Sequence, residues 1–222
     1  MILPLVMSQA CTHQNEYVVA TIPDGSITVD GTRSENAWSE THAIKSFLNP
    51  WDKEVCPETS LFLLKDTAFL FFFFDVVDHQ ILAEPTLATE RDIEKGDRVE
   101  LFFSEDKGMG DYYCFEIDPK GRTLAYSAKN YRNFDFDWDV PSGFHVAAQR
   151  HPRGYTVEGA IPLAFIETLC RGPILYFGAY RAEFSRVGND TVVENWLTRI
   201  DPKTPSPDFH VPTSLGRMKL TD

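Results

Sequence analysis

Short apolar stretches alternate with turn residues along almost the whole chain, and this alternation limits the fold more than any other feature. Candidate strands at residues 59–65 and 68–77 are separated only by Asp66 and Thr67, which is the spacing of a β-hairpin. The second stretch is apolar at successive positions, as is typical of a central strand covered on both faces. An all-β fold is therefore expected.

Helical signals are few. Ser34 is placed to cap one helical turn through Trp38, and Pro162 is placed to begin a short helix that ends near Leu169. Many short strands without strand–helix alternation predict a β-sandwich or barrel with one or two short helices. The other candidate strands lie at residues 17–22, 27–29, 99–104, 112–118, 123–128, 144–149, 155–161, 174–184, 191–197 and 215–220.

Length and charge indicate one acidic domain. The 222 residues suit a single all-β domain, because such domains commonly reach about 200–250 residues. We assign residues 17–222 to it. The chain has 33 acidic and 21 basic residues, a net charge of −12, with no basic cluster. This charge excludes nucleic acid and an anionic membrane surface as partners. We expect a monomer.

The first 16 residues resemble an export signal remnant or the N-terminus of a lipoprotein. An apolar run from Ile2 to Met7 is followed by small residues and by Cys11. Export to the periplasm or cell surface is predicted, with a lipid on Cys11 as the means of membrane attachment. No later apolar run approaches the roughly 20 residues that span a bilayer.

No catalytic constellation is apparent in the sequence. The chain lacks G-x-S-x-G, H-E-x-x-H and phosphate-loop motifs, and its four cysteines form no C-x-x-C pair. Carboxylate pairs such as Glu116 and Asp118 are what a glycosidase needs, but an acidic chain contains such pairs by chance. We therefore predict a protein without catalytic activity.

Aromatic residues in polar segments are the strongest signs of a binding site. Trp196 follows Glu194 and Asn195, and Phe209 lies in a loop beside His210. An aromatic ring can stack on the C–H face of a pyranose while nearby carboxylates and amides bind its hydroxyls. The alternatives are that Trp196 belongs to the core and that Phe209 pins the loop.

Four further residues are candidates for the same role. Trp51 and Trp138 lie in polar loops and can serve as exposed platforms. Arg181 and Glu183 alternate around Ala182 and therefore point to one face of a strand. They form either a surface ion pair or a pair of groups that binds sugar hydroxyls.

The order of several segments resembles that of the family 9 carbohydrate-binding modules. No single segment is specific, but their order and spacing together are, and the C-terminal run looks most like standalone, secreted bacterial members. The segments are residues 27–31, Glu35-Asn36-Ala37-Trp38, Phe71 to Asp78, residues 96–103, residues 155–162, Phe209-His210-Val211-Pro212 and Leu215-Gly216.

The resemblance implies an antiparallel β-sandwich of the DOMON-like superfamily that binds a mono- or oligosaccharide, often at a chain end, between two tryptophans. Glu100 matches a ligand-contacting carboxylate, and Phe209 falls near one clamp tryptophan. Glu94 stands where the other tryptophan is expected, and Glu116 stands where an arginine is expected. Three alternatives follow. Trp51 or Trp138 takes the place of the missing clamp tryptophan, or the ligand differs from that of the family, or the protein has no ligand.

The resemblance also implies structural calcium and a role in polysaccharide utilisation. Asp75 and Asp78, at the end of the longest apolar strand, are the predicted calcium ligands. Two other functions stay open. One is a structural or protein-interaction sandwich without a sugar site. The other is a haem-binding electron-transfer domain with Met109, Met218 or His210 as axial ligands.

Overall fold

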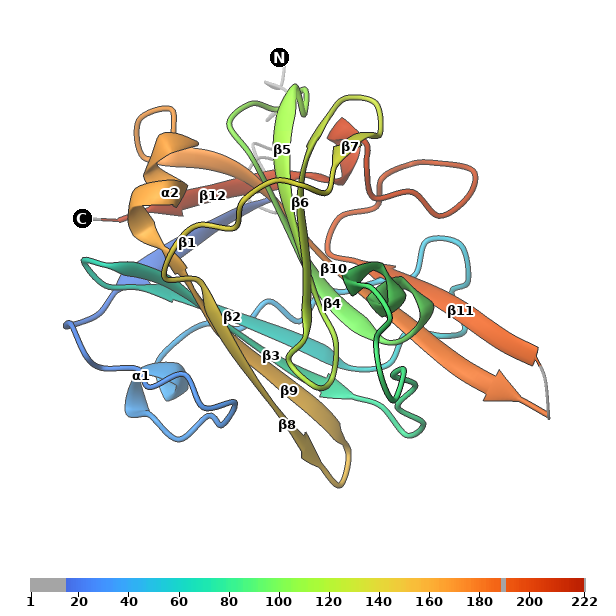
Figure 1. Ribbon diagram of the computed structural model, residues 1–222. Helices are drawn as coiled ribbons and strands as arrows, with labels where there is room; N and C mark the ends of the chain where they lie inside the picture. The colour runs from blue at the N-terminus through green and yellow to red at the C-terminus, as the bar shows by residue number, and fades with distance from the viewer. Residues whose placement is uncertain (1–14, 189–190, 222) are drawn as a thin grey trace, which may run out of the picture.

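The computed structural model describes residues 15–188 and 191–221 (Figure 1). Cys11 and residues 1–14 of the predicted export segment lie outside the described residues, whereas Glu16, its last residue, begins the first strand. Short helical turns occur at α1 (Asn36–Ser39), η1 (Glu90–Lys95), α2 (Leu163–Thr168) and η2 (Pro212–Ser214). The strands are β1 (Glu16–Thr21), β2 (Thr59–Lys65), β3 (Phe69–Val77), β4 (Arg98–Ser104), β5 (Asp111–Ile117), β6 (Thr123–Lys129), β7 (Asn133–Asp135), β8 (His145–His151), β9 (Gly154–Pro162), β10 (Ile174–Val187), β11 (Thr191–Thr198) and β12 (Gly216–Leu220).

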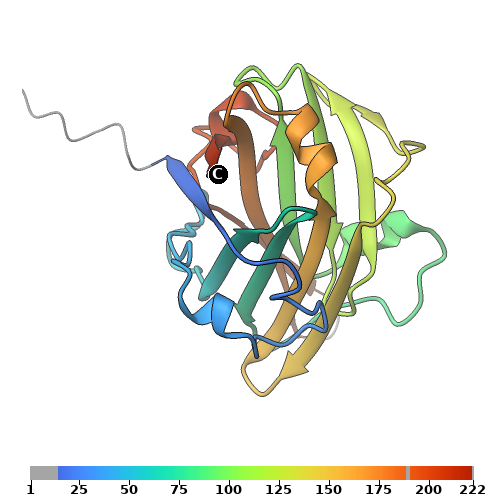
Figure 2. The same ribbon diagram turned by 90° about the vertical axis from the view of Figure 1, so that its left-hand side faces the viewer.

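The strands form two layers that β1 joins at one edge. Sheet A has the order β7-β6-β5-β4-β10-β12, with β11 also paired to β10, and sheet B has the order β2-β3-β9-β8. The first residues of β1 pair in parallel with β12, and Ala20 and Thr21 pair in parallel with β2. The other pairings are antiparallel. Figures 1 and 2 show the green and yellow strands of sheet A crossing the teal and gold strands of sheet B. The predicted antiparallel β-sandwich is confirmed.

The main core lies between the sheets and follows from strand alternation. In β4, Val99, Leu101 and Phe103 are buried in this core, because successive side chains of a strand point to opposite faces. In β3, Phe72 and Phe74 point into it. The alternate residues of both strands therefore lie on the outer faces of the sandwich.

Each outer face carries a smaller apolar cluster of its own. On sheet B, Phe71 and Phe73 pack beneath Trp38 of α1, which is fully buried. On sheet A, Phe102, Tyr126 and Tyr180 belong to a second cluster. The four-phenylalanine run of β3 is thus covered on both faces, as its sequence predicts.

Most predicted strands match the observed ones within a few residues, but two local predictions are wrong. Residues 27–29 form no strand, although Ile27 is buried. Ser34 does not cap α1; Glu35 occupies the N-cap position without a side-chain capping bond and instead accepts a hydrogen bond from the backbone N–H of Thr28 (3.1 Å). No helix within the described ranges is long and apolar enough to cross a membrane.

Candidate functional site

A cleft of about 590 Å³ opens on the outer face of sheet A, a volume within the usual range for small-molecule sites. Strands β4, β5, β6 and β7, the β10–β11 hairpin, η1 and the loop at residues 207–210 supply its lining. The lining side chains are Arg91, Glu94, Arg98, Glu100, Glu116, Tyr126, Arg132, Phe134, Phe136, Phe184, Glu194, Trp196, Pro207, Asp208, Phe209 and His210.

Two glutamates and one arginine form the floor of the cleft. Glu100 of β4 and Glu116 of β5 are directly paired across the two strands, and Arg98 lies on the same face of β4. Arg98 Nε donates to Glu116 Oε2 (2.6 Å) and lies 3.0 Å from Glu100 Oε1. Since Nε carries one hydrogen, which points to Glu116, Glu100 Oε1 contacts the positive charge without accepting a hydrogen bond.

Burial and neighbouring charges shift the pKa values of Glu100 and Arg98. Burial, followed by the charge of Glu116, raises the pKa of Glu100 to about 8, and Arg98 only partly opposes this rise. Burial alone would lower the pKa of Arg98, but the carboxylates of Glu100 and Glu116 hold it above its ordinary value. Tyr126 donates to Glu116 Oε1 (2.7 Å). Both oxygens of Glu116 therefore have partners within the protein.

Aromatic rings form the walls. Trp196 of β11 meets Phe209 edge-on at 5.8 Å and Phe184 at 5.5 Å. Phe209 is only 5% exposed and stacks on Tyr180, with ring centroids 4.3 Å apart and planes 12° apart. Stacking of this kind fixes the position of a ring. For Phe209 the sequence left two roles open, a sugar-stacking ring or an anchor for the loop. In the structure Phe209 lines the cleft and also anchors its loop.

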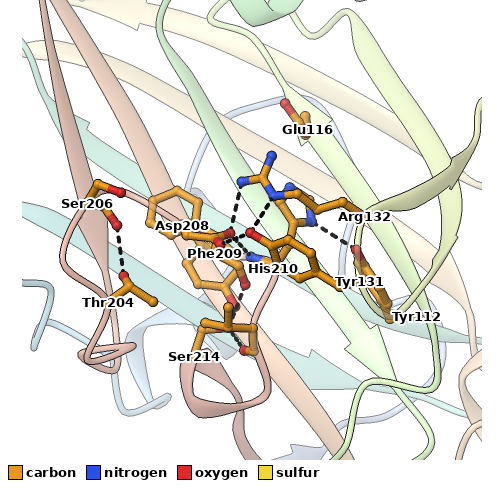
Figure 3. A network of polar contacts seen from close by, with 12 residues as sticks. Tyr112, Glu116, Tyr131, Arg132, Thr204, Ser206, Asp208, Phe209, His210 and Ser214 are labelled. Carbon is orange, nitrogen blue, oxygen red and sulfur yellow. Dashed lines mark hydrogen bonds and ion pairs between the residues drawn. The ribbon is translucent and has the colours of Figure 1, made fainter.

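The opposite wall is fastened to the loop at residues 207–210 by an ionic contact. Arg132 Nη2 donates to Asp208 Oδ1 (2.9 Å), and the hydroxyl of Tyr131 donates to the other carboxylate oxygen (Figure 3). Burial is the largest single influence and opposes ionisation of Asp208. The hydrogen bonds from Tyr131, Arg132 and the backbone N–H of His210, together with the charge of Arg132, outweigh it and lower the pKa of Asp208. The β6–β7 segment and the loop at residues 207–210 are therefore held together across the cleft.

His210 is an uncharged member of the lining. Its ring lies 5.0 Å from those of Phe102 and Phe134, and a 3.1 Å hydrogen bond links its Nδ1 to the hydroxyl of Tyr112. Burial, followed by the charge of Arg132, lowers the pKa of His210 to about 3. Its imidazole is therefore neutral near pH 7. Met218, named with His210 as a haem ligand, lies in the core between the sheets instead.

The structure brings together Glu100, Trp196, Phe209 and His210 of the predicted site residues, and it places Arg181 and Glu183 elsewhere. The latter two do share a face of β10, but that face points toward the interior. Arg181 is fully buried and donates to the carbonyl of Val77 (3.0 Å) and to Asp78 Oδ2 (3.2 Å). Glu183 accepts from Asn195 (2.7 Å). Neither side chain lines the cleft.

The two loop tryptophans also lie outside the cleft lining. Trp51 packs against Phe209 at 6.1 Å, and its indole N–H donates to the carbonyl of Thr204 (3.0 Å). Trp138 packs on Tyr113 (5.0 Å) at the edge of the main core. Trp51 therefore supports a cleft residue, whereas Trp138 covers the core.

Asp75 and Asp78 do not combine into a calcium site. Asp75 faces His151, with Oδ1 3.4 Å from Nε2, whereas Asp78 is neutralised by Arg181. No group of three or more His, Cys, Asp or Glu side chains within residues 15–188 and 191–221 is arranged to hold a metal ion. Calcium needs six to eight oxygen ligands. These two carboxylates do not fit that requirement.

Sequence reasoning missed the cationic half of the site. Arg98 and Arg132 were not singled out as site residues, although Arg98 stands two positions before Glu100 and must share its strand face. Arg98 supplies a guanidinium next to Glu116, where the resemblance led us to expect an arginine. Strand alternation could have identified Arg98, but nothing local in the sequence pairs Arg132 with Asp208, which lie 76 residues apart.

The molecule is thus an antiparallel β-sandwich with an open cleft on the outer face of sheet A. The model of the family described as carbohydrate family 9 binding domain-like matches residues 29–222. The chain belongs to this family, which confirms the resemblance read from the sequence.

Solved structures with the same fold cover nearly all of the chain. A family 9 carbohydrate-binding module from Caldicellulosiruptor kristjanssonii in complex with glucose aligns over 93% of this chain and 95% of its own, with a TM-score of 0.64 and 16% identity. The cellotriose complex from the same organism aligns over 92% and 93%, with a TM-score of 0.64 and 18% identity. A Bacteroides uniformis protein for which carbohydrate binding has been suggested aligns over 93% and 99%, with a TM-score of 0.67 and 14% identity. No curated protein matches the sequence.

Proposed function

We propose that the protein binds a mono- or oligosaccharide, without catalysis, in the cleft of sheet A. The observation that carries this proposal is the meeting of aromatic walls and buried ionic groups in one open cleft. Family membership and the glucose and cellotriose complexes of structural neighbours support it.

The cleft supplies both kinds of contact that a sugar needs. Trp196, with Phe134 and Phe136 on the opposite wall, offers apolar surface for the C–H groups of a pyranose. Glu100 and Arg98 offer polar groups for the hydroxyls between them. The Arg132–Asp208 pair and the Phe209–Tyr180 stack hold the walls in place. A site held in this way loses little conformational entropy when a ligand binds.

A glycan array followed by calorimetry on the best ligand tests the proposal. We expect Trp196→Ala to weaken binding by about 1.5–3 kcal/mol, because the half-buried indole contributes its area to the sugar and little to the core. Trp138→Ala is the matched control, since this tryptophan covers the core away from the cleft. Thermal unfolding verifies that both variants are folded at the assay temperature.

Two outcomes would contradict the proposal. An array without any hit would favour the structural or protein-interaction alternative. If chromatography detects hydrolysis products of the bound saccharide, the claim that the protein lacks catalytic activity is overturned, while the claim that it binds sugar stands.

We extend the proposal to location and assembly: the protein acts outside the cytoplasm as a monomer, attached to a membrane through lipid on Cys11. The apolar run and small residues before Cys11 support it. Cell fractionation of the parent and of Cys11→Ser tests attachment. Recovery of the two proteins in the same fraction would contradict it, and light scattering gives the assembly state.

A further inference from the structure

Within the proposed function, we infer that Tyr131 forms a second sugar subsite at the rim of the cleft, so that the protein binds an oligosaccharide more tightly than a monosaccharide. The inference rests on the sugar-binding role of the cleft and names the class of ligand that it takes. One sugar unit lies in the cleft, and the next unit stacks on the ring of Tyr131.

Tyr131 is the one exposed Phe, Tyr or Trp side chain in the described ranges 15–188 and 191–221. Its exposed fraction is 59%, whereas the other rings within these ranges are half-buried or buried. Tyr131 also belongs to none of the three apolar clusters of the described chain. Packing in the core therefore does not account for an aromatic residue at this position.

Hydrogen bonds fix the ring beside the cleft (Figure 3). The hydroxyl of Tyr131 donates to a carboxylate oxygen of Asp208 and accepts from Arg132 Nε (3.1 Å). Arg132 and Asp208 both line the cleft, so Tyr131 stands directly at its rim. A side chain whose position is already fixed loses little conformational entropy when a ligand stacks on it.

The turn between β6 and β7 presents this ring to solvent. Lys129 pairs with Asn133 across the turn, and Tyr131 is the middle one of the residues between them. The next residue, Arg132, has φ +59°, a left-handed conformation that costs free energy in a residue with a Cβ. Strain of this kind is found preferentially at ligand-binding sites. A conformation that holds Tyr131 outward beside a cleft fits such a role.

One face of the ring is open to a ligand. The guanidinium of Arg132 lies over the ring, with Cζ 5.6 Å from its centre. Since this contact covers one face, the opposite face is the one left for a ligand. An open aromatic face can stack on the C–H face of a pyranose while the hydroxyls at the edge of the sugar stay hydrated.

The position of Tyr131 continues the aromatic surface of the cleft. Phe134 and Phe136, a few residues further along the same segment, line the cleft itself. The Arg132–Asp208 ion pair stands between these two rings and Tyr131 along the rim. A sugar chain that leaves the cleft past this ion pair therefore meets Tyr131 next.

Calorimetry with glucose and cellotriose tests the inference, because the two ligands differ in the number of sugar units and not in the kind of unit. We expect the full chain to bind cellotriose about tenfold more tightly than glucose, the factor that corresponds to removing about 60 Å² of apolar surface from water. If a glycan array identifies another sugar, its monosaccharide and trisaccharide take the place of these two.

Two variants separate the ring of Tyr131 from its hydroxyl. Tyr131→Ala and Tyr131→Phe both lose the hydrogen bonds to Arg132 and Asp208, so any effect of losing these bonds is common to both. Only Tyr131→Phe keeps the ring. We expect it to retain the parent's preference for cellotriose within about twofold, and Tyr131→Ala to bring the two affinities within about twofold of each other. Thermal unfolding verifies that both variants are folded.

The outcomes separate this inference from the proposed function. If no mono- or oligosaccharide binds, the proposed function itself fails, and the second subsite fails with it. If the parent binds both sugars equally, sugar binding stands and the second subsite is overturned. If both variants lose the preference, the hydroxyl and not the ring is responsible, and if neither loses it, the preference arises elsewhere in the cleft. Either result overturns the assignment to Tyr131.

Discussion

Each outer face of the sandwich contains a buried glutamate, Glu158 on sheet B and Glu100 on sheet A, and the two differ in how fully the chain satisfies their hydrogen bonds. On sheet B, Glu158 accepts hydrogen bonds from the backbone N–H groups of Asp30 (2.9 Å) and Gly31 (2.8 Å) and from the indole N–H of Trp38 (3.0 Å). On sheet A, Glu100 shares one guanidinium with a second glutamate and keeps an oxygen that accepts no hydrogen bond from the described residues. The described chain thus completes the hydrogen bonds of Glu158 but leaves one oxygen of Glu100 without a donor.

The satisfied glutamate explains why several segments that resemble the family occur together. Gly31 has φ +84°, and a Cβ at this position would lie 2.9 Å from the side chain of Gln149, so a glycine is required for the turn that presents its N–H to Glu158. Trp38 then closes the outer face of sheet B by bonding to the same carboxylate. These segments secure the fold and contribute nothing to the cleft.

The largest predicted effect on stability is that of replacing Glu158, whose hydrogen bonds the chain completes. Glu158→Ala leaves two buried donors and one part-buried donor without an acceptor, and we expect the free energy of unfolding to fall by about 4 kcal/mol. Urea denaturation measures it. Glu158→Gln, which keeps one acceptor oxygen, should lose less. A loss below about 1 kcal/mol in the alanine variant would show that Trp38 and the turn are held by packing alone.

A smaller effect, on the pH dependence of stability, is expected when Glu100 is replaced. The pKa of Glu100 is raised to about 8 in the folded protein, so the folded state keeps a proton that the unfolded chain releases near pH 4.5. Stability must then fall as the pH rises between these values. Asp97, whose pKa burial and Asp78 also raise to about 8, adds to this fall. Glu100→Gln should flatten the decline without abolishing it.

Thermal unfolding at a series of pH values from about 5 to about 8.5 measures this slope. The charges that act on Glu100 are those of Arg98 on its own strand, Glu116 on β5 and Glu94 of η1. Glu94→Gln should change the slope little, because this carboxylate is more solvated. Parallel curves for the parent and Glu100→Gln would show that Glu100 is ionised throughout.

The smallest effect is expected at an exposed carboxylate. The side chain of Asp75 is 45% exposed, and its one ion-pair partner within the described chain is His151, which is charged only when protonated. Asp75→Asn should change the unfolding free energy by less than about 0.5 kcal/mol. A chelator should leave the melting temperature unchanged as well. A large drop in either measurement would restore the calcium site predicted from the sequence.

Local pattern accounts for most of the fold and for about half of the site. Strand alternation and turn spacing sufficed to place β2 and β3 and the β4–β5–β6 meander, and Pro162 sufficed to place the α2 helix. The same alternation showed that Arg181 and Glu183 share a face, but it could not say that this face meets Asp78 and the interior. That depends on which strands flank β10, and pairing between distant strands is not encoded in either segment alone.

The parallel pairing of β1 with both sheets has a consequence for how the chain reaches its native state. Glu16 lies beside Arg217, and the hydroxyl of Thr221 donates to the carbonyl of Val19 across 202 positions of sequence. A ribosome releases the first of these segments long before it has made the second. The part of β1 that pairs with β12 therefore stays without its partner strand until β12 has been synthesised. Contacts of such long sequence separation slow folding, so closure of this edge should be a late step in biosynthesis and the step most exposed to aggregation or chaperone binding.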